Sequence, residues 1–237
     1  MRTSERRQLK QDRFAETTKE TISWAVSHRT PLIWVLSAAA VLAAVVLGSW
    51  WYWNYHSQQA SAALGKAMEI YNAPLRAPDT PPAGEEVNFA TAVERAKAAR
   101  AQFDQVAGQY SHTKSGRIAR YMAALTAINM GDDKSGEEQL RQVAAAGDRD
   151  LSSLAKLALA GIYRNTHRDK EALDLYQDLV SHPTASVSKP MAQLELASFY
   201  EATKQNAEAA RLYQEIVKEN PGATAASFAR QHMQGQK

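Results

Sequence analysis

The chain has 237 residues and contains no cysteine. The absence of cysteine excludes a disulfide framework, Cys-containing zinc sites, iron–sulfur ligation and a thiol nucleophile. Lys and Arg outnumber Asp and Glu by 28 to 25. Residues 1–30 hold seven of the basic residues and four of the acidic ones, so residues 31–237 carry 21 of each sign. The basic character belongs to the N-terminal tail, which argues against a nucleic-acid partner for the rest of the chain.

Residues 31–53 form an apolar stretch of 23 residues without a charge. At 1.5 Å per residue, a helix of this length spans about 34 Å, which is enough to cross the hydrocarbon core of a lipid bilayer. Trp34 lies near one end of the stretch. The other end carries a belt of aromatic residues: Trp50, Trp51, Tyr52, Trp53 and Tyr55. Such belts are typical of membrane interfaces, so the sequence predicts a transmembrane helix over residues 31–53.

The charges on either side of this stretch predict its orientation. Seven Lys and Arg residues precede it, and the first one after it is Lys66. The positive-inside rule makes residues 1–30 a cytoplasmic leader and places residues 56–237 on the other side of the membrane. A cleaved signal peptide would use Ala60-Ser61-Ala62, but this site lies beyond the aromatic belt, and 30 leading residues are long for such a signal. We expect a single-pass membrane anchor with a cytoplasmic N-terminus.

The remaining sequence has a helical pattern. Residues 54–87 are expected to form a connecting helix and then a loop with several prolines. Residues 88–237 alternate helical stretches with short polar turns and form one further domain. No window alternates apolar and polar residues in the manner of a strand, so the fold class is all-α.

A pattern of small and aromatic residues recurs every 36 or 37 residues. The best copy combines Leu159-Ala160-x-x-Tyr163 with Ala172-x-x-x-Tyr176. It recurs as Leu196-Ala197-x-x-Tyr200 with Ala209-x-x-x-Tyr213. Weaker copies contain Ala123, Ala124, Gly136 and Leu140, and then Phe103 and Val106. The pattern resembles the tetratricopeptide repeat, which implies an α-solenoid of about three to four helix pairs. Small residues would let paired helices approach, and tyrosines would fill the gaps between pairs.

The sequence offers no catalytic chemistry. The six histidines are scattered, and no two stand four residues apart. Gly131 and Gly136 have the spacing of a phosphate loop, but Glu137 and Glu138 stand where Lys and Ser or Thr are needed. A set of carboxylates occupies the predicted outer face of one helix: Glu171, Asp174 and Asp178. We therefore expect no enzyme activity, no catalytic, cofactor-binding or metal site, no cofactor and no small-molecule substrate.

Protein recognition remains as the predicted function. In tetratricopeptide repeats the first helix of each pair lines the concave face. Counting from the Leu/Ala pair gives eleven inward positions, the concave row: Ile118, Tyr121, Leu125, Asn129, Leu154, Leu157, Arg164, Asn165, Met191, Leu194 and Glu201. Most are aliphatic or aromatic, so the row is a candidate groove for an apolar peptide or helix of a partner. Alternatively, the chain's own 222–235 helix closes the groove, with Ala223, Ala226, Phe228 and Met233.

The whole arrangement resembles the YfgM-like ancillary SecYEG translocon subunit family. The resemblance rests on the short leader, the span, the segment Gly48-Ser49-Trp50-Trp51-Tyr52-Trp53-Asn54 and the Ser/Gln/Ala-rich helix 57–63 that leads into the repeats. The proline-rich insertion at residues 74–82 departs from the family pattern. The resemblance implies a protein of the bacterial inner (plasma) membrane. Its periplasmic repeats would assist protein export, with translocon subunits, a periplasmic chaperone or exported chains as partners. The alternative function is a cell-envelope scaffold that coordinates division or wall synthesis.

Overall fold

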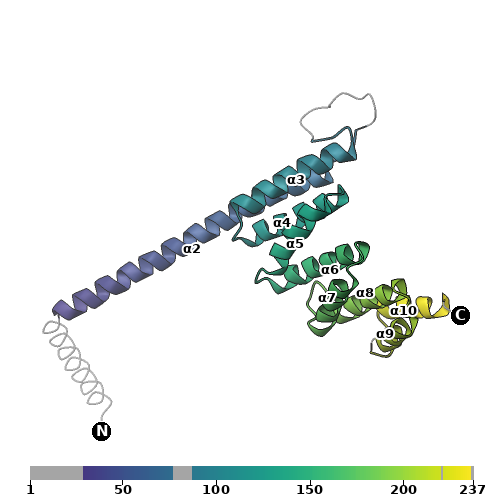
Figure 1. Cartoon of the computed structure of the whole chain (residues 1–237). Coiled ribbons are helices and arrows are strands. Elements are labelled where there is room, and N and C mark those ends of the chain that lie inside the picture. The colour runs from purple at the N-terminus through teal and green to yellow at the C-terminus, as the bar shows by residue number, and fades with distance from the viewer. Residues whose placement is uncertain (1–28, 77–86, 220, 236–237) are drawn as a thin grey trace, which may run out of the picture. The chain divides into compact units, whose positions relative to one another are not determined.

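The computed structural model describes residues 29–76, 87–219 and 221–235. Over these residues the regular structure is helical, and the one β feature is an isolated bridge between Leu75 and Phe89 (Figure 1). This confirms the predicted all-α class. The chain divides into two units, Met1–His56 and Ser57–Lys237. Most of the predicted cytoplasmic leader lies outside the described residues.

The first described helix, α2 (Arg29–Asn72), contains 44 residues and is the longest element. It includes the predicted membrane segment and continues without a break into the predicted connecting helix. The large apolar side chains that the structure describes between residues 33 and 55 are each more than half exposed. By length and composition, α2 is a candidate membrane span.

The unit from residue 57 onward is a stack of helix pairs. The last four turns of α2 pair with α3, because Ala60 and Ala67 are fully buried in one cluster with Ala99 and Phe103. The following helices are α3 (Ala92–Gln109), α4 (Lys114–Asn129), α5 (Asp133–Ala144), α6 (Arg149–Asn165), α7 (Asp169–Ser181), α8 (Lys189–Ala202), α9 (Asn206–Glu219) and α10 (Thr224–Gly235). From α3 on, each helix packs against the next one in the chain. This order of contacts confirms the predicted solenoid of tetratricopeptide-like repeats.

The backbone repeats with the same period as the sequence. Gly131, His167 and Lys204 have positive φ angles of 83°, 56° and 62°, and each follows the first helix of a pair. The N–H of the next residue donates to a carbonyl five residues back in all three turns: Asp132 to Ala127, Arg168 to Tyr163 and Gln205 to Tyr200. This is the hydrogen bond of a Schellman cap, which ends a helix with a residue in the left-handed region. The spacings of 36 and 37 residues therefore hold for the chain's turns as well as for its side chains.

Four equivalent positions on the second helices form the centre of the core. Phe103, Leu140, Tyr176 and Tyr213 are each at most 1% exposed. The Tyr176 ring of α7 lies 5.7 Å from the Phe199 ring of α8, and so fills the gap between consecutive pairs. The predicted role as buried wedges is confirmed for Tyr163, Tyr176 and Tyr213, whereas Tyr200 is only half-buried.

Small residues let the paired helices approach each other, as predicted. Ala99, Gly136, Ala172 and Ala209 stand four residues before the four central positions and are buried. A Cβ atom on Gly136 would lie 2.5 Å from the Ile128 side chain and 3.0 Å from a backbone oxygen of α4. The glycine that resembled part of a phosphate loop is therefore a helix-packing residue.

A charged network joins two successive pairs. The Arg168 guanidinium donates to both carboxylate oxygens of Glu137, at 2.9 and 2.6 Å, and Arg141 Nη2 lies 2.6 Å from Glu137 Oε1. Arg168 also stacks over the Tyr163 ring, with 4.2 Å from Cζ to the ring centroid. The hydrogen bonds from Arg168, together with the charge of Arg141, lower the pKa of Glu137 below its ordinary value. The network therefore links α5 to the end of α6 and the start of α7.

Candidate protein-binding surface

The concave row begins on α4. Ile118 and Tyr121 are half-buried and pack against the central core cluster, which also contains Leu140 and Tyr163. Leu125 is half-buried, whereas Asn129 is exposed at the last position of the helix. The α4 part of the row is thus partly used for packing and partly available to a partner.

The next part of the row lies on α6. Leu154 and Leu157 are half-buried and pack beside Leu179, Val187 and Ala192. Val187 precedes α8 and Ala192 lies in its first turn, so this small cluster continues the row from one pair to the next. Two polar members of the row stand at the end of α6: Arg164, which is half-buried, and Asn165, which is exposed.

The last part of the row lies on α8. Met191 is 39% exposed, and Leu194 packs with residues of α9 and α10. Glu201 Oε2 lies 3.4 Å from Nδ1 of His232, which stacks on the Tyr213 ring at 5.2 Å between centroids. Burial raises the pKa of the Tyr213 phenol, and the neighbouring Glu201 carboxylate raises it further. Glu201 is therefore part of the contact between α8 and the C-terminal helix.

The structure brings some of these positions together and separates others. Ile118, Tyr121 and Leu157 pack against one core cluster, and Leu157 also belongs to the cluster with Leu154. Leu194 belongs to a different cluster, at the C-terminal end. Leu157 is thus the middle of the apolar part of the row.

The C-terminal helix packs at the end of the stack. Helix α10 contacts α9 and α8, and buries Ala226 and Ala229 against Tyr213 and Ile216. Its Phe228 side chain remains 54% exposed. Helix α10 thus packs beside Leu194 and Glu201 at the end of the concave row, whereas Leu157 belongs to two other clusters.

The three carboxylates predicted on the outer face of one helix are either exposed or next to basic side chains. Glu171 and Asp174 are exposed on α7. Asp178 accepts from Lys156 Nζ at 2.6 Å and lies 2.9 Å from Nδ1 of His182. Within residues 29–76, 87–219 and 221–235, no group of three or more His, Asp or Glu side chains is placed to hold a metal ion.

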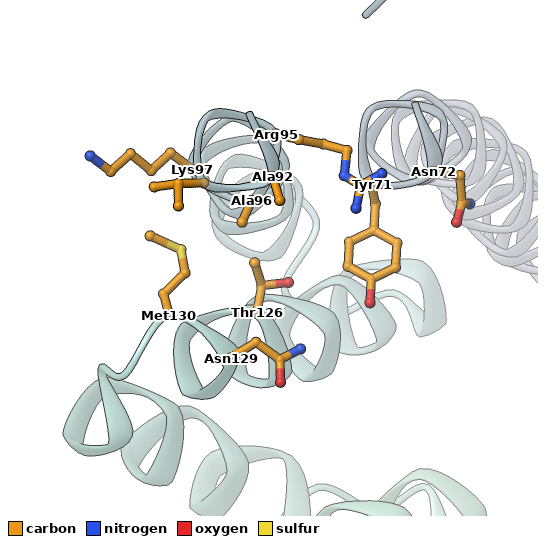
Figure 2. Close-up of a pocket in the computed structure, with 10 residues that line it drawn as sticks. Tyr71, Asn72, Ala92, Arg95, Ala96, Lys97, Thr126, Asn129 and Met130 are labelled. Atoms are coloured by element: carbon orange, nitrogen blue, oxygen red, sulfur yellow. The ribbon is translucent and has the colours of Figure 1, made fainter. Parts of the chain in front are cut away.

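Sequence reasoning missed a cavity of about 660 Å³ at the end of the first pair (Figure 2). Its walls come from the end of α2, the start of α3 and the end of α4: Tyr71, Asn72, Ala92, Val93, Arg95, Ala96, Lys97, Thr126, Asn129 and Met130. Asn129 is the one member of the concave row in this set. One signal of the cavity is visible in the sequence, namely the proline-rich insertion that separates the two helices of the first pair.

Comparisons with known proteins support the fold. The structure is similar to two crystal structures of a putative kinesin light chain from Podosopora anserina with nearly identical TPR-like repeats. One of them, a form with a single substitution, has 19% identity and a TM-score of 0.50, over 71% of this chain and 78% of that one. The other has 19% identity and a TM-score of 0.49, over 70% and 76%. No curated protein sequence gives a significant match. The model of the tetratricopeptide repeat-like domain matches residues 33–182, so this chain belongs to the tetratricopeptide repeat-like domain family.

Proposed function

We propose that this chain is a non-catalytic protein-interaction module that is anchored in a bacterial inner membrane by α2. Its repeats would lie in the periplasm and assist protein export, or the handover of exported chains to a periplasmic chaperone, at the Sec translocon. The observation that carries the proposal is the apolar, more than half-exposed segment 33–55 of α2, in the same helix that supplies the first helix of the solenoid.

The first part of the proposal is the anchor. Bulky apolar side chains are exposed along more than six turns of helix, and a lipid bilayer is the solvent in which such a surface is stable. The family match begins at residue 33, so the family model includes this segment. The seven Lys and Arg residues within residues 1–30 favour a cytoplasmic N-terminus.

The second part is partner binding by the concave row. Its centre, Leu154 and Leu157, is apolar and half-buried, with Val187 beside it. A peptide or helix with an apolar face would bury these side chains further and gain about 25 cal/mol for each Å² removed from water. Two partners held in one membrane also meet at a raised local concentration, so a modest affinity is sufficient.

Site-specific photo-crosslinking in cells tests this function. A photoreactive phenylalanine analogue replaces Leu157 in the full-length chain, and a matched control carries it at Gln177, which is exposed on α7. We expect adducts at Leu157 with translocon subunits, periplasmic chaperones or exported chains, and none of these at Gln177. Adducts with division or wall-synthesis proteins would instead support the envelope scaffold. Equal adducts at both positions would contradict binding by the concave row.

A further inference from the structure

The cavity at the end of the first pair has the size of a ligand site. Its volume of about 660 Å³ lies within the range of roughly 300–1,000 Å³ that is usual for binding pockets. Tyr71 and Met130 form apolar walls, and Ala92 and Ala96 leave room between them (Figure 2). The cavity can therefore hold one or two side chains of a bound peptide.

The charge of the cavity is positive. Among the residues that the structure describes, ten line the cavity, and they include Arg95 and Lys97 and no carboxylate. Both cations lie in the first two turns of α3, where the helix dipole adds further positive potential. Glu94 precedes Arg95 in the chain but does not line the cavity. An anionic group in this cavity would be favoured by Arg95, Lys97 and the helix dipole.

The two cations have different roles. Arg95 Nη1 donates to the backbone oxygen of Ala73 at 2.9 Å, which fixes the guanidinium between α3 and the end of α2. An arginine has five N–H donors, so others remain for a ligand. Lys97 is exposed, and in Figure 2 its side chain extends away from Arg95, on the Met130 side of α3. Arg95 is therefore a fixed donor on the Tyr71 side of the cavity, and Lys97 is an exposed charge on the Met130 side.

After α2, exposed apolar side chains are concentrated in the segment that leads into α3. Five large apolar side chains are exposed among the described residues that follow α2: Leu75, Val87, Val93, Met191 and Phe228. Three of the five lie between the end of α2 and the second residue of α3, and one of these, Val93, lines the cavity. A partner at this end of the solenoid would thus meet apolar surface next to positive charge.

We propose that this cavity binds an acidic peptide segment of a partner protein, with an apolar side chain between Tyr71 and Met130, one Asp or Glu carboxylate at Arg95 and a second at Lys97 (Figure 2). Because Arg95 and Lys97 are both positively charged, the cavity favours an acidic peptide over a neutral or basic one. The site is separate from the apolar centre of the concave row at Leu157. A negative result in the test of one site therefore leaves the proposal for the other site unchanged.

Fluorescence anisotropy with the detergent-solubilised full-length chain tests the proposal. The probe is a fluorescein-labelled peptide, Ser-Leu-Leu-Asp-Leu-Asp-Ser, with an amidated C-terminus. We expect saturable binding that Lys97→Glu weakens by about five- to tenfold, because reversal of the charge replaces attraction by repulsion. Lys170→Glu, on the exposed start of α7, is the matched control and should leave the affinity unchanged.

Three outcomes would overturn the proposal. The first is the absence of saturable binding, and the second is an equal loss of affinity in Lys97→Glu and Lys170→Glu. The third uses two peptides in which Asn replaces both Asp residues, one with an amidated and one with a free C-terminus. The amidated Asn peptide should bind more weakly than the Asp peptide, and Lys97→Glu should leave its affinity unchanged. If the Asn peptide with a free C-terminus binds as tightly as the Asp peptide, the site takes a terminal carboxylate, and the assignment to acidic side chains is wrong.

Discussion

The first helix pair and the later pairs share a core but differ at their turns. Three residues join the two helices of the α4–α5, α6–α7 and α8–α9 pairs, whereas 19 residues separate α2 from α3. Phe103 of the first pair is as deeply buried as Tyr176 and Tyr213 of the later ones. The 660 Å³ cavity lies at the end where the turn differs. The repeat residues thus determine the core, and the cavity that we propose as a binding site lies at the end with the 19-residue connection.

The largest predicted effect tests the shared core. Tyr176→Ala, Tyr213→Ala and Phe103→Ala should each reduce the free energy of unfolding by about 3–5 kcal/mol, because each removes a fully buried ring. Urea unfolding of the detergent-solubilised chain, followed by circular dichroism, measures the change. A loss below about 1 kcal/mol at either tyrosine would contradict the repeat register.

The next effect compares two glycines in helices. A Cβ atom at Gly116 would clash with the carbonyl group of Tyr110, so Gly116→Ala should destabilise the chain by about 1–3 kcal/mol. Gly161 has open space around its Cβ direction, so Gly161→Ala should stabilise α6 by about 0.5–1 kcal/mol. The two variants should change the urea midpoint in opposite directions. A gain in stability for Gly116→Ala would refute the tight approach of the chain at Tyr110.

The charged network predicts a dependence on pH. Because Arg168 and Arg141 lower the pKa of Glu137, its contribution to stability is complete above its ordinary pKa of 4.5 and is lost as the pH falls through the folded value. Glu137→Gln should cost about 1–2 kcal/mol near pH 7 and progressively less below pH 4.5. Thermal melting of both chains between about pH 3 and 7 measures the difference. A difference that stays constant over this range would contradict the network.

The smallest effect concerns the equivalent turns. His167 and Lys204 adopt the left-handed conformation that favours glycine, and Gly131 occupies the same position in its own turn. His167→Gly and Lys204→Gly should each stabilise the chain by about 0.5–1 kcal/mol, whereas Gly131→Ala should destabilise it by about 1 kcal/mol. Differential scanning fluorimetry detects such shifts. Destabilisation by both glycine variants would show that the three turns are not equivalent.

The solenoid was predictable because its residues repeat. The spacing from Tyr163 to Tyr200 and from Tyr176 to Tyr213 determines which residues meet across a helix pair, and each of these contacts is local. The prediction of a candidate span over the 23 uncharged residues of the apolar segment likewise depends on composition alone.

The cavity was not predictable from the same pattern. It depends on where the chain resumes its helix after the insertion, and no repeat residue encodes that point. Arg95 and Lys97 look like ordinary surface cations in the sequence. They line one cavity with Tyr71 and Met130 because α3 begins at Ala92.

The central claim is that α2 anchors the chain in a membrane with the repeats on the periplasmic side. The chain contains no cysteine, so a single introduced cysteine can be labelled without background. Ser4→Cys and Lys170→Cys variants are treated in intact spheroplasts with a maleimide that cannot cross membranes. We predict that the cysteine at position 170 is labelled at once and the one at position 4 is labelled after permeabilisation alone. Labelling at position 4 with protection at position 170, or recovery of both variants in the soluble fraction, would contradict the account.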